Sequence, residues 1–160
     1  IGSSVGRYAK SFGMTVLAYD PYINKSLAKE VGVKIVTLDY LLKNSDLITL
    51  HAYLSEETKN IINSKAFSKM KSTALLINIG RGELVDENAL LAALTKNRIS
   101  GAALDVFKEE PLPKNSKLIK YAKDHDNLLI TPHIAASTRE SIQVAAREIV
   151  HKVKEFLVSQ

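Results

Sequence analysis

The feature that most constrains this sequence is a series of short apolar runs that recur along its 160 residues. Apolar and polar residues do not alternate within the runs, a pattern typical of strands buried on both faces of a parallel sheet. No run approaches the length of about 20 apolar residues that a membrane-spanning helix needs. We therefore expect buried strands at 16–19, 33–36, 47–50, 74–79, 102–104 and 128–130.

Stretches with helical periodicity separate the apolar runs. Ser64 and Asp86 are predicted N-caps, because their side-chain oxygens can accept hydrogen bonds from the amides of a first helical turn. Ser137 and Glu140 have the spacing of a capping box ahead of the last helix. The expected helices lie at 3–12, 26–31, 38–44, 65–71, 87–96, 117–123 and 137–157. Alternating strands and helices predict an α/β fold, a doubly wound parallel sheet of the Rossmann type with helices on both faces.

Composition excludes several classes of function. The chain has 22 Lys and Arg against 17 Asp and Glu, a net charge of +5, and the cations are scattered rather than clustered. That pattern favours a solvated surface or a small anionic ligand over a nucleic-acid groove, which stays the weakest alternative. The absence of Cys excludes disulfides and thiolate metal sites, and no two His have zinc-helix spacing. We expect no metal, no nucleic-acid partner and no membrane partner.

Charged and imidazole side chains follow the predicted strands. In an open parallel sheet, ligands bind beyond the carboxyl ends of the strands. A single polar residue there is explained by a turn, but five such strand ends at one edge favour a binding site. The residues at these ends are Asp20, His51, Arg81 between Gly80 and Gly82, Asp105 with Glu110 five positions later, and His133.

A second signal lies at the start of the chain. Gly2 enters the first predicted helix, and Asp20 follows 18 residues later at the end of the next predicted strand. This is the spacing between the last glycine of a dinucleotide fingerprint and the acid that binds the adenosine ribose. The first strand and the first two glycines of that fingerprint would precede residue 1. Because a carboxylate repels a 2′-phosphate and no Arg follows Asp20 closely, we expect NAD rather than NADP.

With these residues in view, the chain resembles the nucleotide-binding domain of the D-isomer-specific 2-hydroxyacid dehydrogenases over essentially its whole length. Four segments carry the resemblance, at 12–21, 78–86, 101–111 and 131–135. It implies that residues 1–160 form an NAD-binding domain and that the substrate domain of a two-domain enzyme lies outside this chain. It also implies a cytoplasmic homodimer that acts on a small anionic 2-hydroxy or 2-keto acid.

The resemblance implies a catalytic trio of Arg81, Glu110 and His133. Reduction of a 2-keto acid needs a proton donor, and imidazole has an unperturbed pKa near working pH. A glutamate bonded to the ring favours its protonated form and fixes its orientation. A guanidinium holds a carboxylate through two parallel hydrogen bonds, which a point charge cannot do. The alternative for these three residues is a structural ion network.

The resemblance also implies the cofactor contacts. Ile1 and Gly2 would meet the pyrophosphate, and Asp20 the adenosine ribose. For His51 we expect either a structural role or a contact with the cofactor. Two departures from the family pattern are Tyr53, where Pro is usual, and the pair 135–136, where many members have a glycine. The further residues expected around the cofactor are Ala52, Ile79, Gly80 and Arg81 along the cleft, Asp105 near the nicotinamide carboxamide, and His133, Ala135 and Ala136 around the ring.

Within the family, the segment 101–111 and Asp20 look most like the D-3-phosphoglycerate dehydrogenases of serine biosynthesis. Glyoxylate or hydroxypyruvate reductase and D-lactate dehydrogenase remain alternatives. A formate dehydrogenase is disfavoured, because that branch carries glutamine where Glu110 stands. A function of another class also remains open, a non-catalytic NAD(H)-sensing protein similar to a corepressor, since one fold supports several functions.

Overall fold

The computed structural model describes residues 1–158, which form parallel strands connected by helices. The elements follow in the order α1 (Gly2–Ser11), β1 (Leu17–Ala18), α2 (Lys25–Val31), β2 (Lys34–Ile35), α3 (Leu38–Asn44), β3 (Leu47–Leu50), α4 (Ser64–Phe67), β4 (Leu75–Asn78), the 3₁₀ helix η1 (Gly82–Leu84), α5 (Glu87–Thr95), β5 (Gly101–Leu104), α6 (Lys117–Asp124), β6 (Leu128–Ile130) and α7 (Arg139–Val158). The predicted α/β class and the parallel, Rossmann-like arrangement are confirmed.

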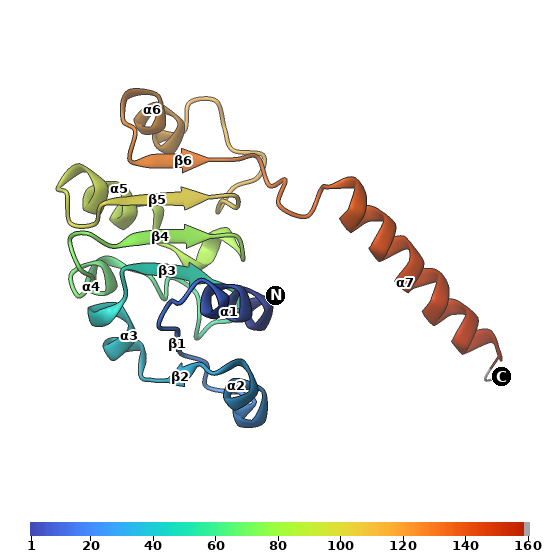
Figure 1. Ribbon diagram of the computed structural model, residues 1–160. Helices are drawn as coiled ribbons and strands as arrows, with labels where there is room; N and C mark the ends of the chain where they lie inside the picture. Colours follow the sequence, from blue (N-terminus) through green and yellow to red (C-terminus); the bar gives the residue numbers. More distant parts are fainter. Residues whose placement is uncertain (159–160) are drawn as a thin grey trace.

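The strands form two hydrogen-bonded sheets rather than one. β1 pairs with β2, and a second sheet has the order β3-β4-β5-β6. Every pair within each sheet is parallel, and the carboxyl ends of β3, β4, β5 and β6 point to the same side (Figure 1). In the same view the N-terminus of α1 lies at this side and α7 leaves from it. The fold therefore gathers the ends of these four strands and the start of α1 at one edge.

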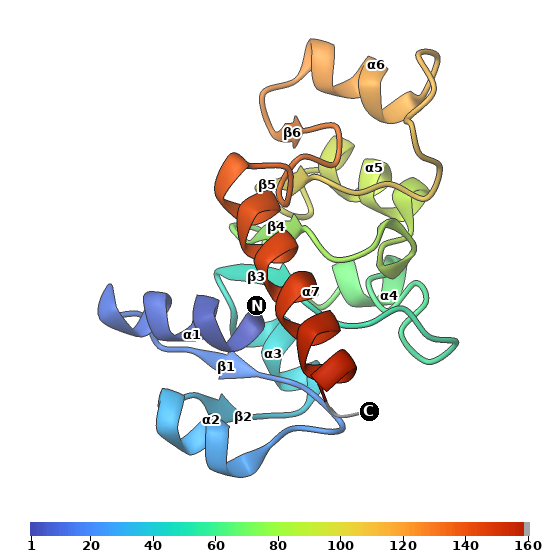
Figure 2. The ribbon, with the colours of Figure 1, turned by 90° about the vertical axis from the view of Figure 1, so that its right-hand side faces the viewer.

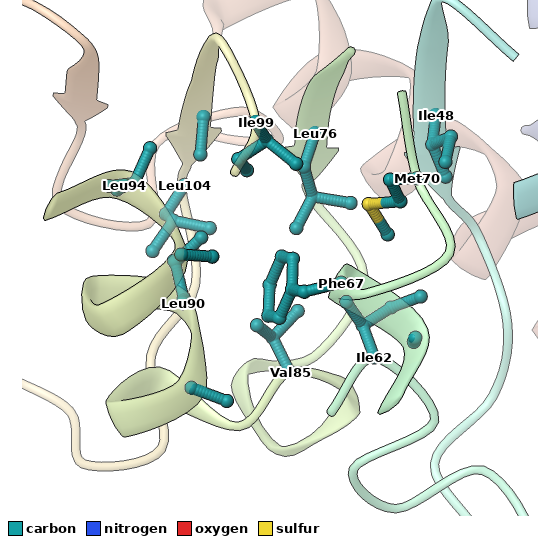
Figure 3. Packing of buried hydrophobic residues seen from close by; sticks show 14 of the residues in the cluster. Ile48, Ile62, Phe67, Met70, Leu76, Val85, Leu90, Leu94, Ile99 and Leu104 are labelled. Atoms are coloured by element: carbon teal, nitrogen blue, oxygen red, sulfur yellow. The ribbon is translucent and has the colours of Figure 1, made fainter. Parts of the chain in front are cut away.

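The hydrophobic core lies on one face of the four-stranded sheet. The row that pairs Ile48, Leu76, Ala102 and Leu128 across the strands is buried, and Leu76 has no exposed surface. Side chains of α3, α4, α5 and α6 join the same cluster, with Phe67 near its centre (Figure 3). Viewed along the strands, α4, α5 and α6 lie on one side of this sheet and α1 on the other (Figure 2).

The opposite face of the four-stranded sheet is open, and here the prediction of burial on both faces is wrong. Leu47 and Leu75 are each 43% exposed, and Leu129 is 64% exposed. The physical reason is that the described helices α4, α5 and α6 all cover the other face. α7 projects away from the body (Figure 1), and none of its described residues is buried.

Two of the predicted helix caps are wrong. Asn63, not Ser64, caps α4, because its Oδ1 accepts from the amides of both Lys65 and Ala66. α4 ends at Phe67, and the chain beyond it continues in tighter turns.

At α7, the hydroxyl of Thr138 accepts from the amide of Ser141, so the cap lies one residue after the predicted Ser137. The predicted cap at Asp86 is confirmed by hydrogen bonds from the amides of Asn88 and Ala89. None of the helices described over residues 1–158 is long and apolar enough to cross a membrane.

The core packing predicts a large stability difference between the two faces of the sheet. Leu76→Ala is expected to lower the free energy of unfolding by about 2–5 kcal/mol, because it leaves a cavity in a fully buried site. Leu129→Ala on the open face is the matched control and should cost much less. Urea denaturation of both variants measures the difference. Equal losses would contradict the assignment of the core to one face.

Candidate active site

The candidate site lies at the edge of the sheet formed by the loops that follow β4, β5 and β6, which are neighbours in the sheet. Arg81 follows β4, Asp105 follows β5 and His133 follows β6. Glu110 lies in the loop after Asp105. The strand order therefore brings Arg81 together with residues that lie 24 to 52 positions later in the sequence.

The side chains of His133 and Glu110 are joined by a hydrogen bond. The ring Nδ1 of His133 lies 2.6 Å from Oε2 of Glu110. The second carboxylate oxygen accepts from the amide of Phe107 at 2.9 Å, so both ends of the carboxylate are held. The bond to His133 is the largest cause that keeps the pKa of Glu110 below its ordinary value, and the charge of Arg81 acts in the same direction. The structure thus joins the three residues of the predicted trio in one electrostatic group.

The side chain of Asp105 holds the loop that carries His133. Its Oδ1 accepts from the hydroxyl of Thr131 at 2.5 Å and from the amide of Ile134 at 2.9 Å. Its Oδ2 accepts from the amide of Ala135 at 2.9 Å. Burial raises the pKa of Asp105, but these hydrogen bonds outweigh it and leave the pKa below its ordinary value. The carboxylate is therefore stable as an anion although only 5% of the residue is exposed.

His133 has a backbone conformation that few side chains adopt. Its φ is +53°, in the left-handed region. Such conformations persist where the surrounding structure determines them. The hydrogen bonds from Ile134 and Ala135 to Asp105 directly follow His133, so they provide that constraint.

Arg81 is exposed and lies in a tightly packed turn. Its Nη1 donates to the carbonyl of Gly80 at 2.8 Å. A β-carbon on Gly82 would lie 1.9 Å from the carbonyl carbon of Phe107, so only glycine permits this approach. The turn after β4 therefore packs directly on the loop that carries Glu110.

The N-terminus of α1 fits the pyrophosphate of a dinucleotide. No side chain caps this end of α1, and its first turn contains no acidic residue. Helix N-termini with free amides bind phosphate groups. The backbone at Gly2 approaches the end of β3 closely, since a β-carbon there would lie 3.3 Å from Cβ of His51. The carboxylate of Asp20, which accepts from the amide of Tyr22, is exposed at the end of β1, where a ribose hydroxyl can reach it.

His51 is partly buried between the helix and the sheet. Its Nε2 lies 3.1 Å from the hydroxyl of Thr49. Burial is the largest cause that lowers the pKa of His51, so the ring is kept neutral. The neutral ring packs against Gly2, which supports a structural role for His51. Its position at the end of β3 is also compatible with a contact to the cofactor.

The remaining predicted cofactor residues lie along the same edge. A β-carbon on Gly80 would lie 3.6 Å from the carbonyl oxygen of Ala52, so the loops after β3 and β4 are in close proximity. Ile79 and Asp105 line one hollow of about 60 Å³. Ile1 and Tyr53 are 87% and 92% exposed, which leaves both available to a ligand. Ala136 is also exposed.

The sequence interpretation missed the residues that hold the site loops. Asn78 donates a hydrogen bond to the turn of Arg81, and Thr131 donates one to Asp105. Glu87 accepts from the amide of Lys108 at 2.8 Å. The only available signal was an amide at the end of an apolar strand, at Asn78. No group of three or more His, Cys, Asp or Glu in residues 1–158 is arranged to hold a metal ion.

Comparisons with known proteins identify the family of this chain. The profile of the family described as D-isomer specific 2-hydroxyacid dehydrogenase, NAD binding domain, matches residues 1–135. D-3-phosphoglycerate dehydrogenase 2 of Arabidopsis thaliana is 43% identical over 96% of this chain and 24% of its own length. Glyoxylate reductase of Korarchaeum cryptofilum is 40% identical over 98% of this chain and 46% of its own.

A solved structure is similar over nearly the whole chain. D-lactate dehydrogenase from Aquifex aeolicus, complexed with NAD and lactic acid, has a TM-score of 0.85 and 39% identity, covering 99% of this chain and 51% of that one. The chain thus spans about a quarter to a half of the length of these relatives. On sequence and fold together, the chain belongs to the NAD-binding domain family of the D-isomer-specific 2-hydroxyacid dehydrogenases.

Proposed function

We propose that the protein is an NAD-dependent oxidoreductase that interconverts a D-2-hydroxy acid and its 2-keto acid. The observation that carries the proposal is the contact of 2.6 Å between Nδ1 of His133 and Oε2 of Glu110, at the same sheet edge as Arg81. A carboxylate bonded to one ring nitrogen orients the imidazole and favours its protonated form. The other nitrogen, Nε2, then gives a proton to the keto oxygen and takes it back in the reverse direction.

Arg81 binds the substrate carboxylate. Its guanidinium offers donors in a planar fork that matches two carboxylate oxygens. Its charge also polarises the carbonyl next to the bound carboxylate. Bound NAD supplies the hydride acceptor for oxidation of the alcohol, and the chain's own residues orient the substrate and carry the proton. The neighbouring Asp105 acts on this chemistry through the loop of His133, whose amides it binds.

The preferred substrate is D-3-phosphoglycerate. Curated D-3-phosphoglycerate dehydrogenases from Arabidopsis thaliana, Synechocystis and Bacillus subtilis are 41–43% identical to this chain. Glyoxylate reductase and glycerate dehydrogenase are 40–41% identical. The difference is small, so glyoxylate or hydroxypyruvate reductase and D-lactate dehydrogenase are the competing substrate assignments.

The proposal includes the assembly around this domain. A substrate domain outside the chain closes over the sheet edge and selects the substrate. The protein is a homodimer and works in the cytoplasm. Support for these points comes from the resemblance to the family and from the fraction of each relative's length that this chain covers.

The full-length protein should oxidise NADH with one of four keto acids, namely phosphohydroxypyruvate, hydroxypyruvate, glyoxylate and pyruvate. Absorbance of NADH measures the turnover. His133→Ala is expected to lower kcat by at least about 10²-fold, the scale of general acid catalysis, while NADH still binds. His125→Ala is the matched control, because His125 is exposed and bonds only locally, to the carbonyl of Tyr121.

One outcome would contradict the proposal. NADH binding by fluorescence without oxidation by any keto acid would favour the NAD(H)-sensing protein. Equal loss of NADH binding and turnover in His133→Ala would instead indicate that the substitution damages the fold.

Glu110→Gln should lower kcat/KM about tenfold or more in both directions, because small misplacements of a catalytic group are costly. The pKa of Glu110 lies below its ordinary value of 4.5, so the wild-type residue is an anion throughout the usual assay range. Its two carboxylate oxygens accept from Nδ1 of His133 and from the amide of Phe107. A glutamine side chain has a donor in place of one of these acceptors, so one of the two bonds is lost.

The control is Glu109→Gln, which removes an adjacent exposed carboxylate. Steady-state kinetics in both directions measure kcat/KM. An unchanged kcat/KM in Glu110→Gln, or an equal loss in Glu109→Gln, would mean that the pairing with His133 does not govern proton transfer.

A further inference from the structure

We infer that Asn78 is a positioning residue for Arg81, an inference that rests on the role proposed above for Arg81. Asn78 is the last residue of β4, and only 1% of it is exposed. Its Nδ2 donates to the carbonyl of Arg81 at 2.8 Å. Its Oδ1 accepts from the amide of Gly80 at 3.1 Å. One side chain therefore spans the turn from which Arg81 projects.

The orientation of this amide is determined by its two partners. The backbone N–H of Gly80 can only donate, and the carbonyl of Arg81 can only accept. The amide oxygen must therefore face Gly80 and the amide nitrogen must face Arg81. A carboxylate of the same size lacks the donor, and an apolar side chain of the same size lacks both groups.

The two side-chain hydrogen bonds of Asn78 reach the two residues that determine where the guanidinium lies, Arg81 and Gly80. The carbonyl of Arg81 also accepts from the amide of Leu84 at 3.2 Å, the bond that begins η1, so Asn78 joins β4 to η1 at this atom. The guanidinium Nη1 donates to the carbonyl of Gly80, and the backbone N–H of the same residue donates to Asn78. Asn78 thus holds the main chain at Arg81 and at Gly80, the residue on whose carbonyl the guanidinium rests.

Asn78 also connects this turn to the other half of the site. Its own carbonyl accepts from the amide of Asp105 at 3.0 Å. The side chain of Asp105 in turn holds the loop of His133. When the side-chain amide is removed, the polar groups of Gly80 and Arg81 lose a partner in a closely packed turn. The turn then rearranges to recover hydrogen bonds with water, and Arg81 moves with it.

A double-mutant cycle in the full-length protein tests this inference. The cycle compares wild type, Asn78→Ala, Arg81→Ala and the double variant by their steady-state kinetics with the keto acid that the protein reduces. Asn78→Ala is expected to raise the KM for the keto acid about tenfold or more, since small misplacements of a positioning group are costly. In the Arg81→Ala background, Asn78→Ala should change kcat/KM by less than about twofold.

Two further variants separate positioning from stability. Leu76→Ala is the matched control, because Leu76 is fully buried two residues earlier on the same strand and makes no hydrogen bond to the turn through its side chain. It should lower the urea midpoint without the rise in KM. Asn78→Asp keeps the size and the acceptor for Gly80 but loses the donor to Arg81, so it should raise KM as Asn78→Ala does.

Three results would overturn the inference. The first is a KM in the Asn78 variants that matches that of Leu76→Ala. The second is a double variant whose loss in kcat/KM is the product of the losses in the two single variants. The third is a crystal structure of an Asn78 variant in which Arg81 has not moved. The crystal structure separates this inference from the proposed function. If no keto acid is reduced, the proposed function fails, while a displaced Arg81 still supports the positioning role and an unmoved one still refutes it.

Discussion

The buried carboxylate of Asp105 is the interaction on which the geometry of the site depends. A buried charge is costly unless hydrogen bonds replace its hydration. Here Thr131, Ile134 and Ala135 provide that replacement, so the same bonds that stabilise the anion also fix the loop around His133. The left-handed backbone of His133 is maintained by this arrangement. The conformation of the His133 loop and the buried charge of Asp105 therefore depend on each other, and neither would be stable without the other.

The parallel sheet explains why such an arrangement forms at this edge. β4, β5 and β6 are consecutive in the sheet and end at the same side (Figure 1), so their following loops become neighbours. The turn of Arg81 then packs on the loop of Glu110 through the glycine at 82, where a β-carbon would lie 1.9 Å from Phe107. Backbone contacts, rather than contacts between the charged groups alone, set the distances among the reactive side chains.

The sequence predicted the elements whose signals are local and missed those that depend on packing. The bounds 38–44, 47–50 and 128–130 agree with the structure, and Asp86 caps α5 as predicted. Apolar runs indicate strands but not which helices cover them, so the open face at Leu129 was not predicted. Likewise, several residues near the start of a helix can cap it. Asn63 rather than Ser64 caps α4 because of the three-dimensional path of the chain, which the sequence does not show.

The same distinction applies to the site. Residue types at strand ends indicated Arg81, Asp105 and His133, because their chemistry is unusual at the end of an apolar run. Asn78 offers only an amide at the end of an apolar strand, and its role follows from two backbone partners that meet it only in the folded turn. The hydrogen bonds of Asn78, Glu110 and Asp105 that hold Arg81 and His133 lie within residues 78–135, inside the segment matched by the family profile. Under the proposed function, the proton-transfer geometry is therefore set within this domain, and residues outside it are left to select among 2-hydroxy acids.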